Sequence, residues 1–185
     1  MNTNGKLRDI IAPNLLVLFT GFNPGLRSAE LGHHYAGPNN RFWRLLFESG
    51  LTPRLLPASE DHLLLNWSLG LTNIVARPTR RAAELTSAEL NSGGEVLRQK
   101  FEHYRPQVAC YVGIGIYKAL TKCRQCLPGR QAQSVVDGVI DFVVPSPSGL
   151  NRIPYADQLA SWRELADLVS DLRTELLSRN NYQKN

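Results

Sequence analysis

The sequence predicts an α/β domain built around a mostly parallel β-sheet. Short, uninterrupted apolar segments that stop at a glycine are typical of strands buried on both faces. Longer segments between them carry apolar residues at helical spacing. Because strands that alternate with helices favour a parallel sheet covered by helices, these patterns together indicate a layered α/β architecture.

Two segments are predicted to be buried parallel strands. Residues 15–19 read Leu-Leu-Val-Leu-Phe and are followed by Gly21, and residues 108–112 read Val-Ala-Cys-Tyr-Val and are followed by Gly113. Residues 70–75 form a further apolar stretch that is either a short strand or a buried loop.

A hairpin is predicted near the end of the chain. The apolar segments 135–136 and 139–144 flank Asp137-Gly138, a pair typical of a tight turn between antiparallel strands. We therefore expect these two segments to pair with each other.

Helices are predicted between the strands. One begins at Asn39 or Asn40 and ends near Gly50. Residues 86–89, Thr-Ser-Ala-Glu, form a capping box that begins a second helix running toward Tyr104.

The second and the last of these helices have distinct features. A Gly93-Gly94 pair weakens the second helix, and no sequence pattern explains it. After Pro154, apolar residues recur at helical spacing as far as Leu176, which predicts a long closing helix.

The length of 185 residues suits a single domain over residues 1–185. We expect its core at about 12–178, with loose ends in the first ten or so residues and from Arg179 to Asn185. No apolar segment reaches the ~18 residues of a membrane span, and the first residues lack the apolar centre of a secretion signal. We therefore expect a soluble, intracellular protein that contacts no membrane.

The chain is basic, because 21 Lys and Arg residues against 16 Asp and Glu residues give a net charge of +5. This charge suits an acidic partner such as nucleic acid. An enzyme that happens to be basic would show the same balance, so the charge leaves both interpretations open.

Three cysteines are too few, and odd in number, for a disulfide framework. Cys123 and Cys126 have the spacing of half a zinc or iron–sulfur site, but a closed site needs four ligands, and nothing in the sequence places His33 or His34 nearby. We expect free thiols and no bound metal.

A nucleotide cofactor is not expected either. Gly113-Ile114-Gly115 follows a predicted strand as a dinucleotide-binding loop does, but position 118 is Lys where that fingerprint has Gly.

The first candidate site is Gly21-Phe22-Asn23-Pro24-Gly25, directly after the first predicted strand. Ligands of open α/β sheets bind beyond the carboxyl ends of the strands, so this loop lies where a site is expected. Asn23 is neutral and can position a water molecule without being a strong base. A plain Asn-Pro-Gly turn would have the same sequence.

The second candidate is Gly32-His33-His34-Tyr35, which precedes residues 38–43. Polar residues around an aromatic side chain suit a pocket that stacks a flat ring on Tyr35. In the alternative interpretation, Tyr35 covers the core and both histidines are solvated.

The third candidate is residues 145–152, Pro-Ser-Pro-Ser-Gly-Leu-Asn-Arg, which also follow an apolar strand. Leu150 near Arg152 suits a wedge, because proteins that distort DNA insert apolar side chains between bases with basic groups alongside. The alternative is a Ser/Pro turn with Leu150 packed inward.

Taken together and in this order, these segments resemble the mismatch-specific uracil-DNA glycosylase and thymine-DNA glycosylase family. The resemblance spans roughly residues 12–165. It is carried by residues 21–26, 32–35, 40–43, 70–79 and 147–152. The Gly-His-His-Tyr segment is similar to the thymine branch, and the Ser-Gly-Leu segment to the bacterial uracil branch.

The resemblance implies a three-layer α/β/α sandwich with a central, mostly parallel sheet of four to five strands. It also implies a monofunctional DNA glycosylase of base excision repair, which flips uracil, and by extension thymine, out of G·U or G·T mismatches in double-stranded DNA. Water then hydrolyses the N-glycosidic bond and leaves an abasic site. We expect no cofactor, a monomer, and a location in the cytoplasm or nucleoid if bacterial, or in the nucleus if eukaryotic.

By matching position, Asn23 is implied to hold the attacking water, and Tyr35 to stack on the flipped base. The main chain at Phe22 and Tyr35 is implied to hydrogen-bond the pyrimidine edge. The implied base pocket is completed by Gly21, Ser28, His34 and Asn73.

The last motif is implied to contact the duplex. Gly149 and Leu150 resemble the wedge, and with Arg152 they are expected at the widowed guanine. Phosphate contacts are expected from Ser146, Ser148 and Arg77.

Other functions stay open. A general uracil-DNA glycosylase would also act on single strands, a binding module would recognise mismatched or abasic DNA without cleaving it, and a small-molecule nucleoside hydrolase would have no use for a wedge. Phe22, Ser28 and Ser146 depart from residues common in the family, and these departures bear on substrate range more than on reaction type.

Overall fold

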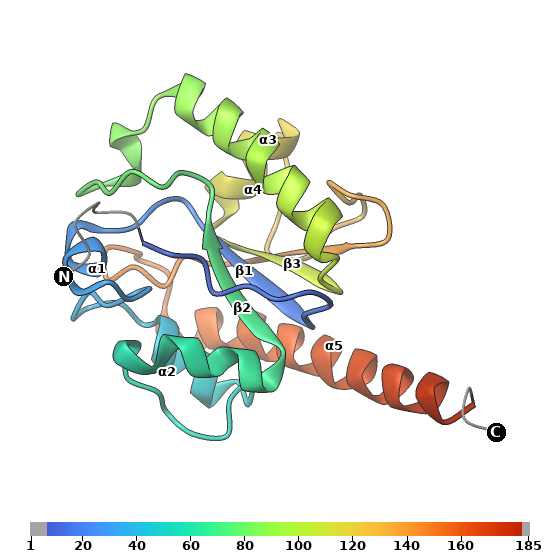
Figure 1. The fold of residues 1–185 in the computed structure, drawn as a ribbon. Coiled ribbons are helices and arrows are strands. Elements are labelled where there is room, and N and C mark those ends of the chain that lie inside the picture. The colour runs from blue at the N-terminus through green and yellow to red at the C-terminus, as the bar shows by residue number, and fades with distance from the viewer. Residues whose placement is uncertain (1–6, 183–185) are drawn as a thin grey trace.

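The central sheet of the computed structural model, which describes residues 7–182, has the strand order β2-β1-β3-β5-β4 (Figure 1). Four strands are parallel, and the short strand β4 pairs antiparallel to β5 at one edge. The strands are β1 (Val17–Gly21), β2 (Leu69–Asn73), β3 (Val108–Val112), β4 (Gly129–Arg130) and β5 (Ile140–Val144). The predicted α/β fold with a mostly parallel sheet is therefore confirmed.

Helices cover both faces of the sheet and give it three layers. Against one face lie α2 (Phe42–Glu48), the 3-10 segment η1 (Ala58–Trp67) and α5 (Tyr155–Tyr182). Against the other lie α3 (Ser87–Tyr104) and α4 (Ile114–Thr121). Neighbouring residues of β1 alternate between the two cores, which is why its sequence is apolar throughout.

One of the two strands predicted for the hairpin, residues 135–136, is not formed. The turn at Asp137-Gly138 is present and is closed by the Val139 N–H donating to the Val136 carbonyl at 3.1 Å. The segment 135–136 is not a strand, because the Val135 N–H donates to the Asp141 carboxylate and Val136 packs into the α3–α4 side of the core. Strand β4 takes the expected place beside β5.

The Gly93-Gly94 pair has a packing explanation. A Cβ atom on Gly93 would lie 2.3 Å from the main-chain oxygen of Ile74, so glycine lets α3 approach the chain after β2. On Gly94 a Cβ atom would meet the side chain of Leu120 from α4 at 2.7 Å. The capping box at the start of α3 is present as predicted.

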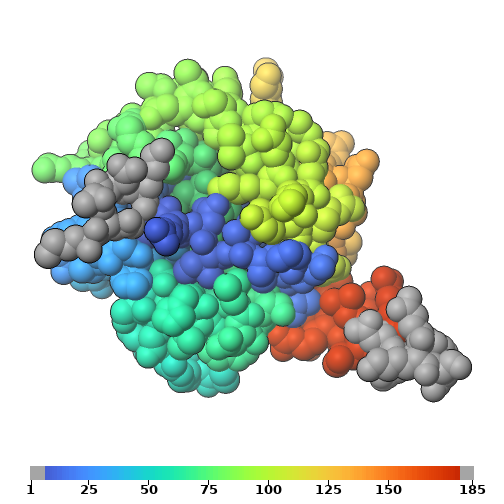
Figure 2. All heavy atoms as spheres, in the orientation of Figure 1, coloured from blue at the N-terminus to red at the C-terminus, as the bar shows by residue number. Residues whose placement is uncertain are grey.

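Part of each predicted loose end has defined structure. Ile10 exchanges two main-chain hydrogen bonds with Leu71, and Lys100 of α3 forms an ion pair with Asp9. In Figure 2 the first described residues, in dark blue, lie along the surface beside the yellow-green α3. Helix α5 continues through Arg179, and its end extends beyond the body of the molecule (Figure 1). Residues 1–6 and 183–185 of the predicted loose ends lie outside the described residues.

Within residues 7–182, no helix combines the length and the apolarity needed to cross a membrane.

Candidate active site

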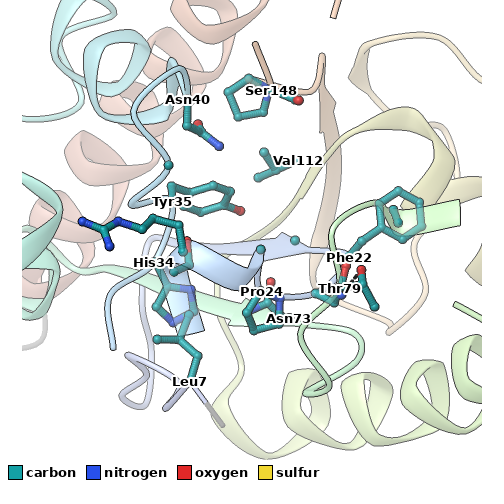
Figure 3. A pocket seen from close by; sticks show the side chains of 18 of the residues that line it. Leu7, Phe22, Pro24, His34, Tyr35, Asn40, Asn73, Thr79, Val112 and Ser148 are labelled. Atoms are coloured by element: carbon teal, nitrogen blue, oxygen red, sulfur yellow. Dashed lines mark hydrogen bonds between the residues drawn. The ribbon is translucent and has the colours of Figure 1, made fainter. Parts of the chain in front are cut away.

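A cavity of about 240 Å³ lies beyond the carboxyl ends of β1, β2 and β3 (Figure 3). Its walls come from all three candidate segments, namely residues 21–25, 34–40 and 146–148. The volume is below the ~300–1,000 Å³ of sites for drug-sized ligands, so it suits a single small ring. The sheet therefore brings the three separated loops together, as the sequence predicted.

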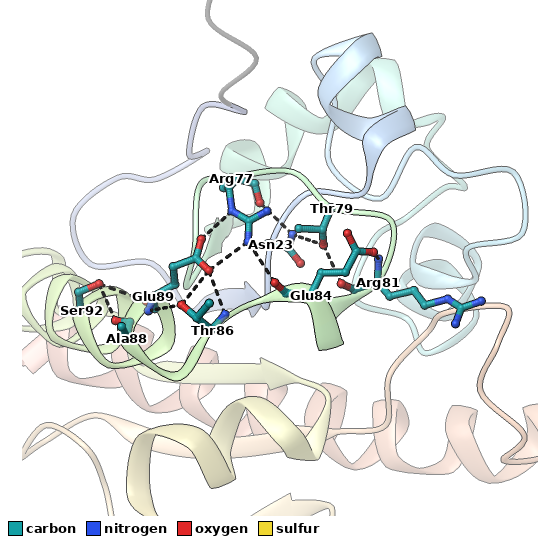
Figure 4. Close-up of polar contacts among 9 residues, drawn as sticks. All are labelled: Asn23, Arg77, Thr79, Arg81, Glu84, Thr86, Ala88, Glu89 and Ser92. Carbon is teal, nitrogen blue, oxygen red and sulfur yellow. Dashed lines mark hydrogen bonds and ion pairs between the residues drawn. The ribbon is translucent and has the colours of Figure 1, made fainter.

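The carboxamide of Asn23 is held in one orientation (Figure 4). Its Nδ2 donates to the main-chain oxygen of Arg77 at 2.8 Å and to Thr79 Oγ1 at 2.7 Å. The Thr79 hydroxyl donates its own proton to the Arg81 carbonyl at 2.8 Å, so toward Asn23 it can act only as an acceptor. Both acceptors therefore require the NH₂ group of Asn23, which leaves its Oδ1 to accept a hydrogen bond from a ligand or a water.

No Asp or Glu is among the described residues that line the cavity. An Asn carboxamide takes no proton at ordinary pH, so it can orient a water molecule but cannot deprotonate it. The site therefore suits a reaction in which water attacks an already electron-poor centre.

Tyr35 forms part of the cavity wall, and its ring stacks on Phe42. Its hydroxyl is buried, without a hydrogen-bond partner among the described residues, and lies 3.1 Å from where a Cβ of Gly21 would be. Burial raises the pKa of Tyr35 above its usual value, so the hydroxyl stays protonated. The same Cβ would lie 2.5 Å from Asn73 Oδ1, so glycine at position 21 makes room for this amide in the cavity.

His34 is buried, which makes the solvated alternative wrong for this residue. Its Nε2 lies 3.0 Å from the Arg8 carbonyl, an acceptor, so the ring proton is on Nε2. Burial lowers the pKa of His34, and the ring is neutral near pH 7. Ser28 is also buried, and its Oγ accepts a hydrogen bond from the Ala36 N–H.

Asp61 is a site residue that sequence reasoning missed. It is 5% exposed and accepts a hydrogen bond from the His34 main-chain N–H at 3.0 Å, while its other oxygen lies 3.2 Å from His33 Nδ1. It therefore braces the loop that carries Tyr35. Asp61 lies in η1, outside all the motifs, and no local pattern marks it.

The segment after β5 ends in an exposed turn. Leu150 is 81% exposed at its tip, so the alternative in which it packs inward is wrong. The turn is closed by the Asn151 N–H, which donates to the Ser148 carbonyl at 2.9 Å. A Cβ on Gly149 would lie 2.8 Å from the main-chain oxygen of Asn39, so glycine lets this turn pack against the segment that contains Asn39.

A family model described as the uracil DNA glycosylase superfamily matches residues 9–169. The chain belongs to the uracil DNA glycosylase superfamily. Among solved structures it is similar to the solution NMR structure of a "putative Uracil DNA glycosylase" from Methanosarcina acetivorans, with a TM-score of 0.58 and 20% sequence identity over 87% of this chain and 97% of that chain. This likeness concerns the fold.

Superfamily membership indicates that the protein is a hydrolytic DNA glycosylase and that DNA is its partner. The predicted contact residues differ in how they face such a partner. Ser146 and Ser148 line the cavity, and Arg152 is exposed and has no ion-pair partner within residues 7–182.

Arg77 is placed differently from the prediction. Its guanidinium donates to both carboxylate oxygens of Glu89, at 2.6 and 3.0 Å, and to the Glu84 carbonyl at 3.2 Å. The bond from Arg77 lowers the pKa of the Glu89 carboxyl to about 2. The phosphate role of Arg77 stays a prediction, and in this structure its half-exposed guanidinium is paired with Glu89.

Proposed function

We propose that this member of the superfamily is a mismatch-directed glycosylase that hydrolyses the N-glycosidic bond of uracil, and of thymine, opposite guanine. The observation that carries the proposal is the Asn23 carboxamide. Its Oδ1 has no hydrogen-bond partner within residues 7–182, and no carboxylate is among the described residues that line the ring-sized cavity beside it.

Base extrusion comes first in this mechanism. A base inside a duplex is out of reach of the cavity, and unpairing it costs a few kcal/mol, least at a mispair. Leu150 is exposed beside the cavity-lining Ser148, where it can fill the space that the base vacates. Preference for a mismatch follows from the low cost of extrusion there.

Bond cleavage then places negative charge on the departing pyrimidine. Phe22 and Tyr35 line the cavity, and their main-chain N–H groups have no acceptor within residues 7–182. Preorganised donors of this kind are worth about 3 kcal/mol each when they meet a developing anion. They stabilise the leaving base while water held by Asn23 Oδ1 attacks C1′ of the sugar. The proton that this water loses goes to the departing pyrimidine anion or to solvent.

The absence of a carboxylate from the described cavity lining makes this a slow enzyme. No group there draws a proton from the water or faces the sugar cation with a negative charge, so the rate rests on leaving-group stabilisation.

Contacts with the DNA phosphates, which do not depend on the base sequence, come from Ser146, Ser148 and the exposed Arg152. We therefore expect duplex binding to weaken steeply as the salt concentration rises.

The test is cleavage of four substrates side by side: G·U, G·T and A·U duplexes, and single-stranded uracil DNA. Alkali then breaks the abasic products. Release from G·U and G·T, with little from A·U or single strands, supports the proposal. Equal release from all uracil substrates would indicate a general uracil-DNA glycosylase, and binding without release would indicate a recognition module.

An Asn23→Ala variant completes this test. We expect it to lose uracil release while it retains affinity for the G·U duplex, because the carboxamide orients water rather than DNA. Full activity in this variant would remove Asn23 from the mechanism.

A further inference from the structure

We propose that the Arg77–Glu89 ion pair is a positioning device for Asn23, and that it acts through the main chain of residues 77–79. This inference rests on the proposed function. It gives Arg77 a role in orienting the water-holding amide instead of one in gripping phosphate.

Both donors of the Asn23 carboxamide go to one short segment. One reaches the main-chain oxygen of Arg77, and the other reaches the side chain of Thr79, which is 4% exposed. The direction of Asn23 Oδ1 is therefore set by where residues 77–79 lie. A shift of this segment would turn the amide or break one of its two bonds.

Residues 77–79 belong to no helix or strand, so other contacts must hold them. The Thr79 N–H donates to the Pro24 carbonyl at 3.1 Å, which fixes one end to the loop after β1. The other end is held by the Arg77 side chain, through its three hydrogen bonds to Glu89 and Glu84 (Figure 4). Arg77 therefore contacts Asn23 with its main chain and α3 with its guanidinium.

Glu89 is a firm anchor because it is part of the N-terminal cap of α3. Its carboxylate also accepts hydrogen bonds from the main-chain N–H and the hydroxyl of Thr86, at 2.9 and 3.0 Å. Helix α3 has 18 residues and packs on the sheet. A bidentate Arg–carboxylate pair adds directional constraint beyond charge attraction, and it connects residue 77 to this rigid element.

Both side chains of the pair are partly exposed to solvent, Arg77 to 49% and Glu89 to 29%. Pairs of this kind add little to overall stability. Its loss should therefore be seen in the reaction more than in folding, and this separates a positioning role from a structural one.

The experiment compares Arg77→Ala and Glu89→Ala with two controls. Arg98→Ala and Glu102→Ala remove the two partners of an ion pair elsewhere on the surface of α3, without touching Arg77 or Glu89. For each protein, three quantities are measured: single-turnover uracil release from a G·U duplex, affinity for a duplex with a non-hydrolysable uridine analogue, and thermal unfolding.

We expect uracil release to fall about 10- to 100-fold in Arg77→Ala and in Glu89→Ala, with duplex affinity changed less than about three-fold. Both controls should release uracil at nearly the wild-type rate. Arg77→Lys should restore part of the rate, since an ammonium group keeps the charge but cannot bind both oxygens of Glu89 in the forked geometry.

Glu89→Ala separates this proposal from a phosphate role for Arg77. If Arg77 gripped DNA, freeing it from Glu89 would tighten duplex binding and leave the rate unchanged, and that result would overturn the proposal. Wild-type rates in both alanine variants would overturn it as well.

A readout that needs no activity separates this proposal from the proposed function. The Asn23 Nδ2 protons, followed by amide hydrogen exchange in NMR spectra, should exchange faster in Arg77→Ala and Glu89→Ala than in Arg98→Ala. If wild-type protein released no base from any substrate, the proposed function would fail, and this exchange comparison would still decide whether the pair positions Asn23. Equal exchange in all variants would refute the positioning role.

Discussion

The ring of Tyr35 lies parallel to the ring of Phe42, with centroids 3.9 Å apart and planes 6° from parallel. Tyr35 has a φ of +52°, a left-handed conformation that is uncommon for a bulky residue. Phe42 is fully buried in the core of the α5 side. The packed core therefore holds Tyr35 at the cavity in spite of an unfavourable backbone conformation.

Tyr35→Phe keeps this stack and removes a buried hydroxyl that has no partner among the described residues. We expect the free energy of unfolding to stay the same or rise by about 1 kcal/mol, because an unpaired buried polar group is costly. Uracil release should stay within a few-fold of wild type, whereas Tyr35→Leu should lose it. A large loss in Tyr35→Phe would mean that the hydroxyl itself contacts the substrate.

Leu150→Ala tests the wedge. The side chain is 81% exposed, so the change in stability should stay within about 0.5 kcal/mol. Uracil release from a G·U duplex should fall, while release from any single-stranded substrate that is processed should not, because a single strand leaves no gap to fill. Equal losses on duplex and single strand would contradict the wedge role.

Gly93→Ala and Gly94→Ala should differ in stability. A Cβ on Gly93 would meet a main-chain oxygen, that of Ile74, at 2.3 Å, so α3 would have to move away from the sheet. A Cβ on Gly94 would meet the far end of the flexible Leu120 side chain, and alanine favours a helix over glycine by about 1 kcal/mol. Urea unfolding should show Gly93→Ala to be clearly less stable than Gly94→Ala. Equal stabilities would contradict the packing explanation of this pair.

Asp141 predicts a pH dependence of stability. It is fully buried on β5, and burial raises its pKa from 3.8 to about 6. Because the folded-state pKa is above the unfolded value, this group's contribution is complete below about pH 4 and is lost as the pH rises through 6, a loss of about 3 kcal/mol at most.

Asp141→Asn keeps an acceptor for the Val135 N–H and removes this titration. The variant should gain stability relative to wild type between pH 4 and pH 8, as measured by urea unfolding at both values. A difference between the two proteins that is the same at both pH values would show that Asp141 does not titrate in this range.

Much of the fold could be predicted because each buried strand is a short, continuous apolar stretch of the sequence. The segment that became β3 matches its predicted bounds, and the capping box of α3 has both of its hydrogen bonds. Helix α4 and the 3-10 segment η1 were not predicted. Helix α4 has only 8 residues and follows Gly113 without a side-chain cap, and η1 has no strong apolar period. The strand that pairs with β5 at the sheet edge is β4, not the predicted segment 135–136. Strand β4 has only two residues and is too short to produce a sequence pattern.

The candidate site could be predicted where a motif carries it, and only there. Asn23 and Ser148 lie on one cavity because β1 and β5 are parallel and end at a common edge, and Tyr35 reaches the same cavity from the loop before α2. Asp61 could not be predicted, since its role depends on a long-range contact with the main chain of His34. The pairing of Arg77 with Glu89 could not be predicted either, because the sequence does not show whether a surface arginine faces a phosphate or a carboxylate.

The hydrogen bond from the His34 ring to the Arg8 carbonyl has a practical consequence for anyone who prepares this protein. The N-terminal arm looks dispensable in the sequence, yet it selects the tautomer of an imidazole in the cavity wall, and Leu7 lines the cavity itself. Trimming the chain past residue 8 would remove both of these contacts from the cavity wall.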